Sequence, residues 1–388
     1  MRILMVSPQF RPLVGGYERA AERLAIGLSH HGHEVTVLAE RRRRSWPKRE
    51  VVDGVTVERW PCWYRPHLHI ATSLVGLAWA LLSRGHRFEV WHVHQPGRHA
   101  ALTILIARLI GVPTVLKLTS SKDAGIKGAS TAGVFGRVCR SLHRRVDAMI
   151  ALTRETGQEA LDFGVPKHRV VVFGNAVDTR SLCPANESSR LAARQRYGLS
   201  SDRSVIFVGR LSPEKNVGCL LRAWAHCLGR LTGNWSLVVV GDGAERSRLE
   251  AVSRSLGLVN TVRFAGQVED PEDIRDWYRA SDLFVQSSNF EGLSNTMLEA
   301  LATGLPIVCT DVSGTTQCVR EPDTGLVVPV GDAERLADAI VELANDDARR
   351  AQMSQRAAAF VRERYSIDHV CQLHEELYRS LIAQGRRQ

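Results

Sequence analysis

The sequence lacks the signatures of several large enzyme classes. Its 388 residues contain no Asp-x-Asp pair, no Gly-x-Ser-x-Gly sequence and no complete P-loop. A metal-bound diphosphate site and a serine-hydrolase site are therefore not indicated. The eight cysteines stand singly, without a Cys-x-x-Cys pair. We interpret them as small core residues of a protein in a reducing compartment, which argues against a disulfide framework and against a zinc site.

Long apolar segments are missing as well. The longest uncharged stretch, residues 66–83, includes histidine and hydroxyl side chains and falls short of a comfortable membrane span. It predicts a buried or interfacial helix. The apolar run at the amino terminus is too short for a signal peptide. We therefore expect a cytoplasmic protein, with peripheral contact to the cytoplasmic face of a membrane left open.

Acidic residues are too few to balance the basic ones. The formal net charge of +10 favours anionic partners. Part of the excess lies in one run, formed by Arg41–Arg44 with Lys48 and Arg49. A solvated loop explains this run, and a patch for a membrane surface or an anionic acceptor is the alternative. Because the basic residues are not interleaved with aromatics on a recognisable module, no nucleic acid partner is expected.

Short β-rich runs alternate with amphipathic stretches from end to end, which predicts an α/β protein with two doubly wound parallel sheets. The length favours two domains. We place them at residues 1–180 and 181–364, joined through a polar segment, 178–202, and followed by a helix, 365–388, that crosses back to the first domain. Ligands of such sheets bind beyond the carboxyl ends of the strands, in a cleft between the domains. The predicted strands are residues 2–7, 33–39, 55–60, 90–95, 113–119, 148–153, 168–173, 204–209, 235–240, 261–265, 283–287, 306–310 and 325–329.

Two glycine-containing turns follow predicted strands. Gly15 and Gly16 stand between the first strand and a helix that begins near Tyr17. Glycines there let the backbone approach a ligand, and the helix start offers N–H groups to a phosphate. In the second half, Gly241 opens a Gly-x-Gly turn whose third fingerprint glycine is missing, which favours a tight turn lying against a nucleotide.

Two cations lie on one loop after the strand at 204–209. Arg210 follows Gly209 directly, and Lys215 stands at the entry to the next helix. An arginine fork and a lysine point charge can clamp both phosphates of a diphosphate and offset charge on it as it departs. The alternative is a pair of solvated cations, but a lysine at a helix amino terminus opposes the helix dipole.

Two glutamates, Glu291 and Glu299, are separated by seven residues after the strand at 283–287. Between them, Gly292, Leu293 and Ser294 precede a helix whose free N–H groups suit phosphate oxygens. Glu299 lies among apolar neighbours, where a carboxylate needs a partner such as two adjacent ribose hydroxyls. Glu291 is placed to hold hydroxyls of a sugar.

Acceptor-side candidates come from the first half. His92 and His94 alternate on one face at the end of a strand, and with no third ligand in sight they make a poor metal pair. Structural histidines are one interpretation, and His94 facing the cleft is the other. Ser120 follows the strand at 113–119 and is the second candidate. No metal is expected at any of these positions.

These motifs together resemble glycosyltransferase family 4, whose members are retaining enzymes with the two-domain GT-B fold. The resemblance covers nearly the whole chain, from Gly15-Gly16 through Gly209-Arg210 and Lys215 to Glu291-x7-Glu299. It implies metal-independent transfer of a sugar from a nucleoside diphosphate sugar to a glycan or lipid-linked acceptor, with retained anomeric configuration. It also implies that Arg210 and Lys215 bind the diphosphate, Glu299 the ribose and Glu291 the donor sugar, with Gly16 near the diphosphate.

The chain departs from the family pattern at two places, one of which is Gln317, where a glutamate is often found after Gly314. Many members carry a histidine after the fifth strand of the first domain, where this sequence has Leu118-Thr119-Ser120-Ser121. Two other activities stay open at this point. A GT-B sugar-nucleotide epimerase would share the fold, and a nicotinamide dehydrogenase would share parallel sheets with a Gly-x-Gly turn.

Overall fold

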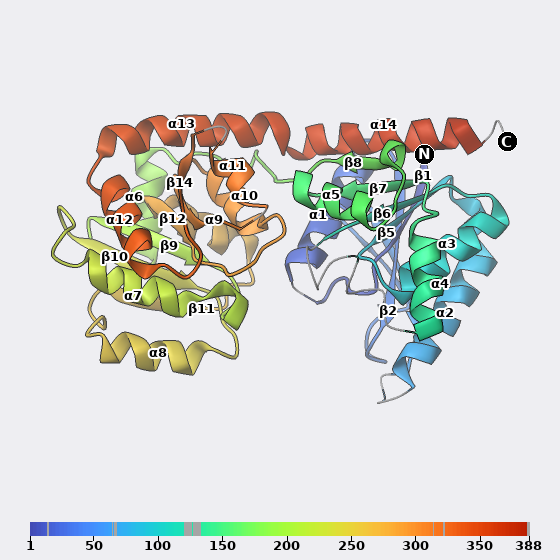
Figure 1. The fold of residues 1–388 in the computed structure, drawn as a ribbon, viewed down its shortest axis with the longest axis horizontal. Coiled ribbons are helices and arrows are strands. Elements are labelled where there is room, and N and C mark those ends of the chain that lie inside the picture. The colour runs from blue at the N-terminus through green and yellow to red at the C-terminus, as the bar shows by residue number, and fades with distance from the viewer. Residues whose placement is uncertain are drawn as a thin grey trace. The chain divides into compact units, whose positions relative to one another are not determined.

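The computed structural model describes residues 1–388 apart from 14, 64, 66–67, 120–125, 127–132, 313, 321–322 and 386–388. The chain divides into two compact units (Figure 1). The first contains Met1–Ala176 together with Ile367–Gln388, and the second contains Val177–Ser366. Among the described helices, none combines the length and the apolar character needed to cross a membrane.

The first unit is built on an eight-stranded sheet in the order β3-β4-β2-β1-β5-β6-β7-β8. All neighbouring pairs are parallel except β3 and β4. The strands are β1 (Arg2–Val6), β2 (Glu34–Arg41), β3 (Arg49–Val52), β4 (Val55–Pro61), β5 (Val90–His94), β6 (Thr114–Lys117), β7 (Ala148–Ala151) and β8 (Val170–Val172).

Helices cover both faces of this sheet. Apolar side chains of α1 (Gly16–His30) and α14 (Ile367–Gly385) pack on one face. On the opposite face lie α2 (His69–Arg84), α3 (Arg98–Ile110) and α5 (Arg154–Asp162). The α4 helix (Gly133–His143) packs beside α3, and α2 packs on the other side of α3 (Figure 1). Two short 3-10 turns, η1 (Gly85–Arg87) and η3 (Lys167–Arg169), complete this part of the fold.

One strand departs from the predicted all-parallel arrangement. β3 pairs antiparallel with β4 across a two-residue turn, Asp53-Gly54, in which both residues have positive φ, 50° and 80°. Such a turn matches the twist of a hairpin, and an Asp-Gly pair is its usual sequence signal. The sequence analysis did not predict β3, because this strand has only four residues and begins inside the basic run, whose residues 42–48 form the loop between β2 and β3.

The second unit has a six-stranded, all-parallel sheet in the order β11-β10-β9-β12-β13-β14. Its strands are β9 (Arg203–Val208), β10 (Trp235–Val240), β11 (Val262–Gly266), β12 (Leu283–Gln286), β13 (Ile307–Thr310) and β14 (Gly325–Val328). Its helices are α6 (Glu187–Arg196), η4 (Pro213–Lys215), α7 (Val217–Cys227), α8 (Arg246–Ser255), α9 (Pro271–Arg279), α10 (Asn295–Ala302), α11 (Thr316–Arg320), α12 (Ala333–Ala344) and α13 (Asp347–Arg364).

The two faces of this sheet are covered by different helices. Apolar residues of α7, α8, α12 and α13 form one core with alternate strand residues. On the other face, Tyr278 of α9 packs on Phe284 of β12 with ring centroids 6.3 Å apart, and α10 contacts β12 and β13. All thirteen predicted strands lie within two residues of an observed one. The predicted α/β fold with two doubly wound sheets is confirmed.

The polar segment at 178–202 does not act as a free linker. Its helix α6 packs on α9 within the second unit. Arg194 donates to the carbonyl oxygens of Ala280 and Ser201, and the Tyr197 ring stacks on Trp277 at 3.9 Å. Buried guanidinium hydrogen bonds of this kind fix the segment to the sheet unit.

Candidate active site

Several predicted donor-site residues gather at the carboxyl edge of the second sheet. Arg210 follows β9, Gly241 follows the neighbouring β10, and Glu291 lies in the turn after β12, which flanks β9 on the other side. Adjacent parallel strands end at the same edge of a sheet, so these turns lie next to one another. Arg210 is exposed there.

Gly241 is required by the way two of these turns pack. Its φ is 132°, and a Cβ built on it would lie 1.9 Å from the carbonyl oxygen of Gly209. The Gly209 N–H in turn donates to the Val240 carbonyl at 3.0 Å. Any larger residue at position 241 would push away the backbone that carries Arg210. The predicted tight turn is thus observed, and its partner is the cation-bearing loop.

Lys215 and Glu291 form an ion pair between the two turns. The lysine Nζ donates to Glu291 Oε2, and both side chains are 18% exposed. The main chains are joined as well, because the Asn289 N–H donates to the Glu214 carbonyl at 2.8 Å and the Ser287 hydroxyl to the Lys215 carbonyl at 2.9 Å. The sequence predicted these two side chains for one site, and the structure brings them into contact.

The charged groups of this loop act on one another. The pKa of Glu214 is below its ordinary value although burial, the largest single influence, acts to raise it. A hydrogen bond from Ser212 and a backbone hydrogen bond, with smaller contributions from the charges of Arg210 and Lys215, together outweigh that burial. Glu214 therefore stays ionised beside the two cations.

The amino terminus of α10 is capped and tightly supported. The Ser294 hydroxyl accepts from the Met297 N–H at 3.3 Å, which satisfies one of the orphan donors of the first turn. Leu293 is buried. A Cβ on Gly314 would lie 1.5 Å from the Gly292 carbonyl oxygen, so the turn before α10 rests directly on the backbone of another loop. Such packing holds the helix start in one position.

Glu299 is buried inside α10, as its apolar neighbours implied, and it has a protein partner. The Tyr278 hydroxyl of α9 donates to Glu299 Oε2 at 3.1 Å and lies 3.2 Å from the Thr296 carbonyl. Sequence reasoning did not find Tyr278. The sequence contains little indication of this role, because the Trp277-Tyr278 pair is typical of residues in a hydrophobic core.

In the first unit, Gly15 is the N-cap of α1 and Gly16 is its first residue. Gly15 has extended backbone angles and no side chain to cap the helix. The Gly15 carbonyl accepts from the Arg19 N–H at 3.1 Å. The structure therefore puts this glycine pair at a helix start, where an anion is favoured.

His94 ends β5 with its ring buried on the face covered by α1 and α14. It stacks on His92 at 4.4 Å, and neither Nε2 atom has a hydrogen-bond partner among the described residues. His92 Nδ1 lies 2.6 Å from the Tyr378 hydroxyl of α14. Burial, with the charge of Lys117 and other neighbours, holds the pKa of His94 well below its ordinary value. Its assignment to the acceptor side stays a prediction, and Ser120 lies outside the described residues.

Lys117 was missed by the sequence analysis. It ends β6 directly beside His94, is 1% exposed, and burial lowers its pKa to about 8. Its position inside the apolar run Val115-Leu116-Lys117-Leu118 was the signal that could have found it. A buried lysine at the carboxyl edge of a sheet costs stability unless it serves a purpose.

Among the described residues, one group of three side chains could hold an ion, and it belongs to the first unit: Glu40, Cys62 and His69.

Two Rossmann-like α/β units with strand-end turns of this kind define the class of GT-B glycosyltransferases. The solved structures of Anabaena HepE in complex with UDP (TM-score 0.80, 21% identity, covering 98% of this chain and 100% of that one) and of sucrose-phosphate synthase from Thermosynechococcus elongatus (TM-score 0.81, 21% identity, 99% of each) share this fold.

Sequence comparison then gives the family. The model "Glycosyl transferases group 1" matches residues 189–360, and "Glycosyl transferase 4-like domain" matches residues 15–176. A GDP-mannose-dependent alpha-mannosyltransferase of Mycobacterium tuberculosis is 30% identical over 367 residues, which is 92% of each chain. The alpha-D-kanosaminyltransferase of Streptomyces kanamyceticus is 29% identical, over 79% of this chain and 82% of that one. The chain belongs to glycosyltransferase family 4 and is a glycosyltransferase. Neither the epimerase nor the dehydrogenase is favoured by these findings.

Proposed function

We propose that this enzyme transfers a sugar from a nucleoside diphosphate sugar to a hydroxyl group of a glycan or lipid-linked acceptor, with retained anomeric configuration and without a metal ion. The observation that carries the proposal is the pairing of Lys215 with Glu291 beside Arg210. A cation for the diphosphate and a carboxylate for sugar hydroxyls stand in contact at the strand ends where ligands of such sheets bind.

The chemistry rests on charge. As the bond between the anomeric carbon and the diphosphate oxygen breaks, negative charge builds on the leaving diphosphate. Arg210 and Lys215 offset that negative charge, and the N–H groups at the start of α10 stabilise it further. The departing phosphate oxygen takes the proton of the acceptor hydroxyl, whose oxygen bonds to the anomeric carbon from the same face. The diphosphate leaves protonated, so the step needs neither a protein nucleophile nor a metal.

The remaining donor contacts follow from side-chain chemistry. Glu299 accepts hydrogen bonds from two adjacent ribose hydroxyls. The hydrogen bond from Tyr278 orients its carboxylate for this role. Glu291 accepts from hydroxyls of the transferred sugar. Gly209 and Gly241 leave room for the nucleotide at the strand ends, and Gly15 and Gly16 supply backbone N–H groups to an anionic part of the substrate.

The first testable prediction concerns the donor. Because a ligand that binds the folded state stabilises it by mass action, a thermal-shift panel of UDP-, GDP-, ADP- and TDP-sugars is expected to give a raised Tm with one base class. GDP-mannose is the first donor to test, because the name of the Mycobacterium tuberculosis relative includes it. At a concentration 100 times Kd the gain is about 2.7 kcal/mol. Glu299→Gln, which keeps the volume and loses the charge, is expected to reduce the shift for every donor.

Two results would count against this assignment. One is the absence of a shift with all four classes. The other is an unchanged shift in Glu299→Gln, which would remove the ribose contact from the proposal. Retention is checked separately, by the anomeric configuration of the product in an NMR spectrum.

A membrane surface is the partner that fits the outside of the first unit. The neighbouring helices α2, α3 and α4 contain no acidic residue. These helices expose many apolar side chains. They also expose four arginines: Arg84, Arg108, Arg137 and Arg140. Exposed apolar area with a basic surround favours a lipid interface that carries anionic headgroups. The apolar residues of this α2–α3–α4 face are Ile70, Val75, Trp79, Leu82, Leu105, Leu109, Phe135 and Val138.

The second prediction tests this face. The protein is expected to sediment with vesicles that contain anionic lipid, and to be released as salt is raised, because the screening length falls to roughly 3 Å at 1 M salt. Trp79→Glu should weaken binding severalfold. Val259→Glu, which changes an equally exposed apolar residue of the second unit, is the matched control and should not. Equal binding of both variants would exclude the face.

A further inference from the structure

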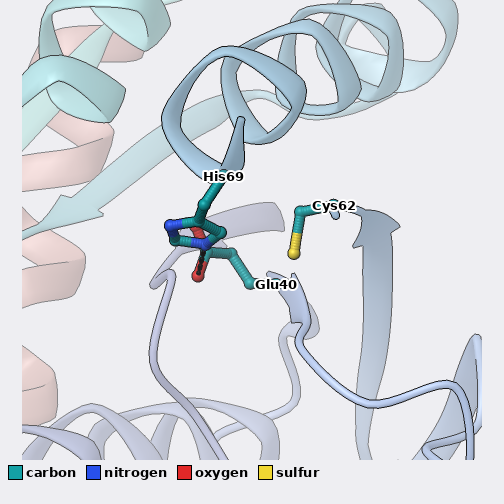
Figure 2. Close-up of side chains that lie close together, drawn as sticks. All are labelled: Glu40, Cys62 and His69. Atoms are coloured by element: carbon teal, nitrogen blue, oxygen red, sulfur yellow. Dashed lines mark ion pairs between the residues drawn. The ribbon is translucent and has the colours of Figure 1, made fainter. Parts of the chain in front are cut away.

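Three side chains of different chemistry converge in the first unit (Figure 2). Glu40 lies near the end of β2, Cys62 directly after β4, and His69 at the start of α2. The sulfur, a ring nitrogen and a carboxylate oxygen all lie within 4.8 Å of one another. Glu40 is buried, and the other two are half-buried. The segments meet because β2 and β4 are adjacent parallel strands that end at the same edge, where α2 begins.

The spacing fits a small tetrahedral ion. With metal–nitrogen and metal–oxygen bonds of about 2.0–2.1 Å, two such ligands of a tetrahedral zinc lie about 3.3 Å apart. His69 Nε2 and Glu40 Oε2 are 3.4 Å apart. A zinc–sulfur bond of about 2.3 Å calls for roughly 3.5 Å between Sγ and each of the others. Cys62 Sγ lies within 4.8 Å of the other two ligand atoms and donates to the Arg41 carbonyl at 3.6 Å, a contact that metal binding would replace.

Glu40 is held in place as metal-binding carboxylates usually are. Its Oε1 accepts from the Ser73 hydroxyl at 2.6 Å, and Ser73 in turn accepts from the Trp60 indole N–H at 3.1 Å. This buried chain orients the carboxylate towards His69 and Cys62. On its other side, Arg42 Nε donates to Oε2 at 3.0 Å and balances the carboxylate charge.

We propose that Glu40, Cys62 and His69 form a binding site for a thiophilic divalent cation of the Zn²⁺ type. Thiolate, imidazole and carboxylate are the three ligand kinds that zinc takes in proteins, and three protein ligands leave one position for water. On binding, the metal replaces the thiol proton of Cys62, which passes to solvent. This proposal departs from the sequence analysis, which expected no zinc site because the eight cysteines stand singly, without a Cys-x-x-Cys pair.

Such an ion would fasten the start of α2 to the strand ends of β2 and β4. The ion would lie in the first unit, whereas Arg210, Lys215, Glu291 and Glu299 belong to the second. The competing interpretation is an ion pair of Glu40 with Arg42 that happens to have a cysteine and a histidine nearby. The two interpretations differ in metal affinity, which can be measured directly.

The experiment uses the tag-free full-length protein and Co²⁺ as a spectroscopic probe. One equivalent is expected to give the charge-transfer absorption of a cobalt–thiolate bond, and Zn²⁺ should displace it. Cys62→Ser should abolish this band and weaken Zn²⁺ binding, measured by competition with a coloured chelator, by about 100-fold or more. Ser73→Ala, which loosens Glu40, should weaken it by about 10–100-fold.

Cys183→Ser is the matched control, because Cys183 is a half-buried free cysteine of the second unit. It should leave both the band and the affinity unchanged. The proposal is overturned if wild type gives no thiolate band, or if Cys62→Ser binds Zn²⁺ as tightly as wild type does. A donor-induced thermal shift in Cys62→Ser equal to that of wild type would show that donor binding survives the loss of the metal site, which separates this result from the proposed function.

Discussion

Replacing Lys215 by alanine is expected to lower turnover by about 10²–10³-fold while leaving the fold intact. The size follows from what is lost, a preorganised positive charge aimed at a leaving group whose negative charge grows as the bond breaks. The interaction is stronger in the transition state than with the bound donor, so the loss should fall mainly on kcat and less on KM. Initial rates over a range of donor concentrations separate the two constants.

The ion pair with Glu291 complicates this variant, because removing the lysine leaves a carboxylate without its partner. Two further variants resolve the question. Lys215→Arg keeps a cation and should recover part of the rate. The double variant Lys215→Ala with Glu291→Gln removes the stranded charge, and its rate should stay low if the lysine acts on the diphosphate. Recovery in the double variant would assign the defect to Glu291.

Lys167→Ala is the control for this series, because Lys167 is an exposed lysine on η3 of the first unit. Its rate and Tm should match those of wild type. A Lys215→Ala enzyme with near-normal turnover and an unchanged Tm would contradict the assigned role outright.

Acidification from pH 6.5 towards pH 4 is expected to unfold the first unit. Four of its histidines are buried and uncharged, and burial is the largest cause that lowers the pKa of each. The pKa of His143 falls to about 4 and that of His374 to about 3. The pKa values of His92 and His94 lie well below 6.5, the ordinary value. In the unfolded chain all four titrate near 6.5.

The sign follows from proton binding. Below pH 6.5 the unfolded state takes up protons that the folded state does not, so stability falls as pH falls. The stabilisation is fully present above pH 6.5 and is lost on the way down to the folded pKa values. Each histidine that stays neutral in the folded state contributes a slope of at most about 1.4 kcal/mol per pH unit, and the slopes of the four act in the same direction. Lys117, with its pKa near 8, is charged in both states throughout this window and adds no slope.

His374→Phe tests the contribution of one member. The His374 ring lies 5.5 Å from His92 and 4.8 Å from Phe173, so a phenyl ring has apolar and aromatic neighbours there. The midpoint of acid unfolding, followed by circular dichroism, should move to lower pH. His168→Gln changes an exposed histidine of the same unit and should leave the midpoint where it is. If wild type, His374→Phe and His168→Gln unfold at the same pH, the protonation of carboxylates and not of buried histidines would determine the pH of acid unfolding.

Sequence patterns were reliable where a local cause is sufficient. The alternation of apolar runs set the strands to within two residues, and the glycines at 15–16 and 241 marked strand-end turns that exist. The Asp53-Gly54 pair is also a local hairpin signal, but β3 before it is short and begins in the basic run, so its sequence lacks the apolar alternation of a strand. The apolar face of α1 was predicted. On α14 the buried positions include two polar residues: Tyr378, whose hydroxyl lies 2.6 Å from His92 Nδ1 on the sheet, and His374, which bonds to the Val370 carbonyl of its own helix.

The sequence by itself determined the family, the two doubly wound sheets and the residue types of the donor site, because periodicity and turn chemistry are written in neighbouring positions. Only the tertiary structure decided which of these residues touch. It put Lys215 against Glu291, gave Glu299 its tyrosine, buried Lys117 among histidines, and gathered Glu40, Cys62 and His69 at one edge. Tyr278 and Glu299 are 21 positions apart and Lys215 and Glu291 are 76 apart, and such pairs meet through strand order and helix packing, which local spacing does not encode.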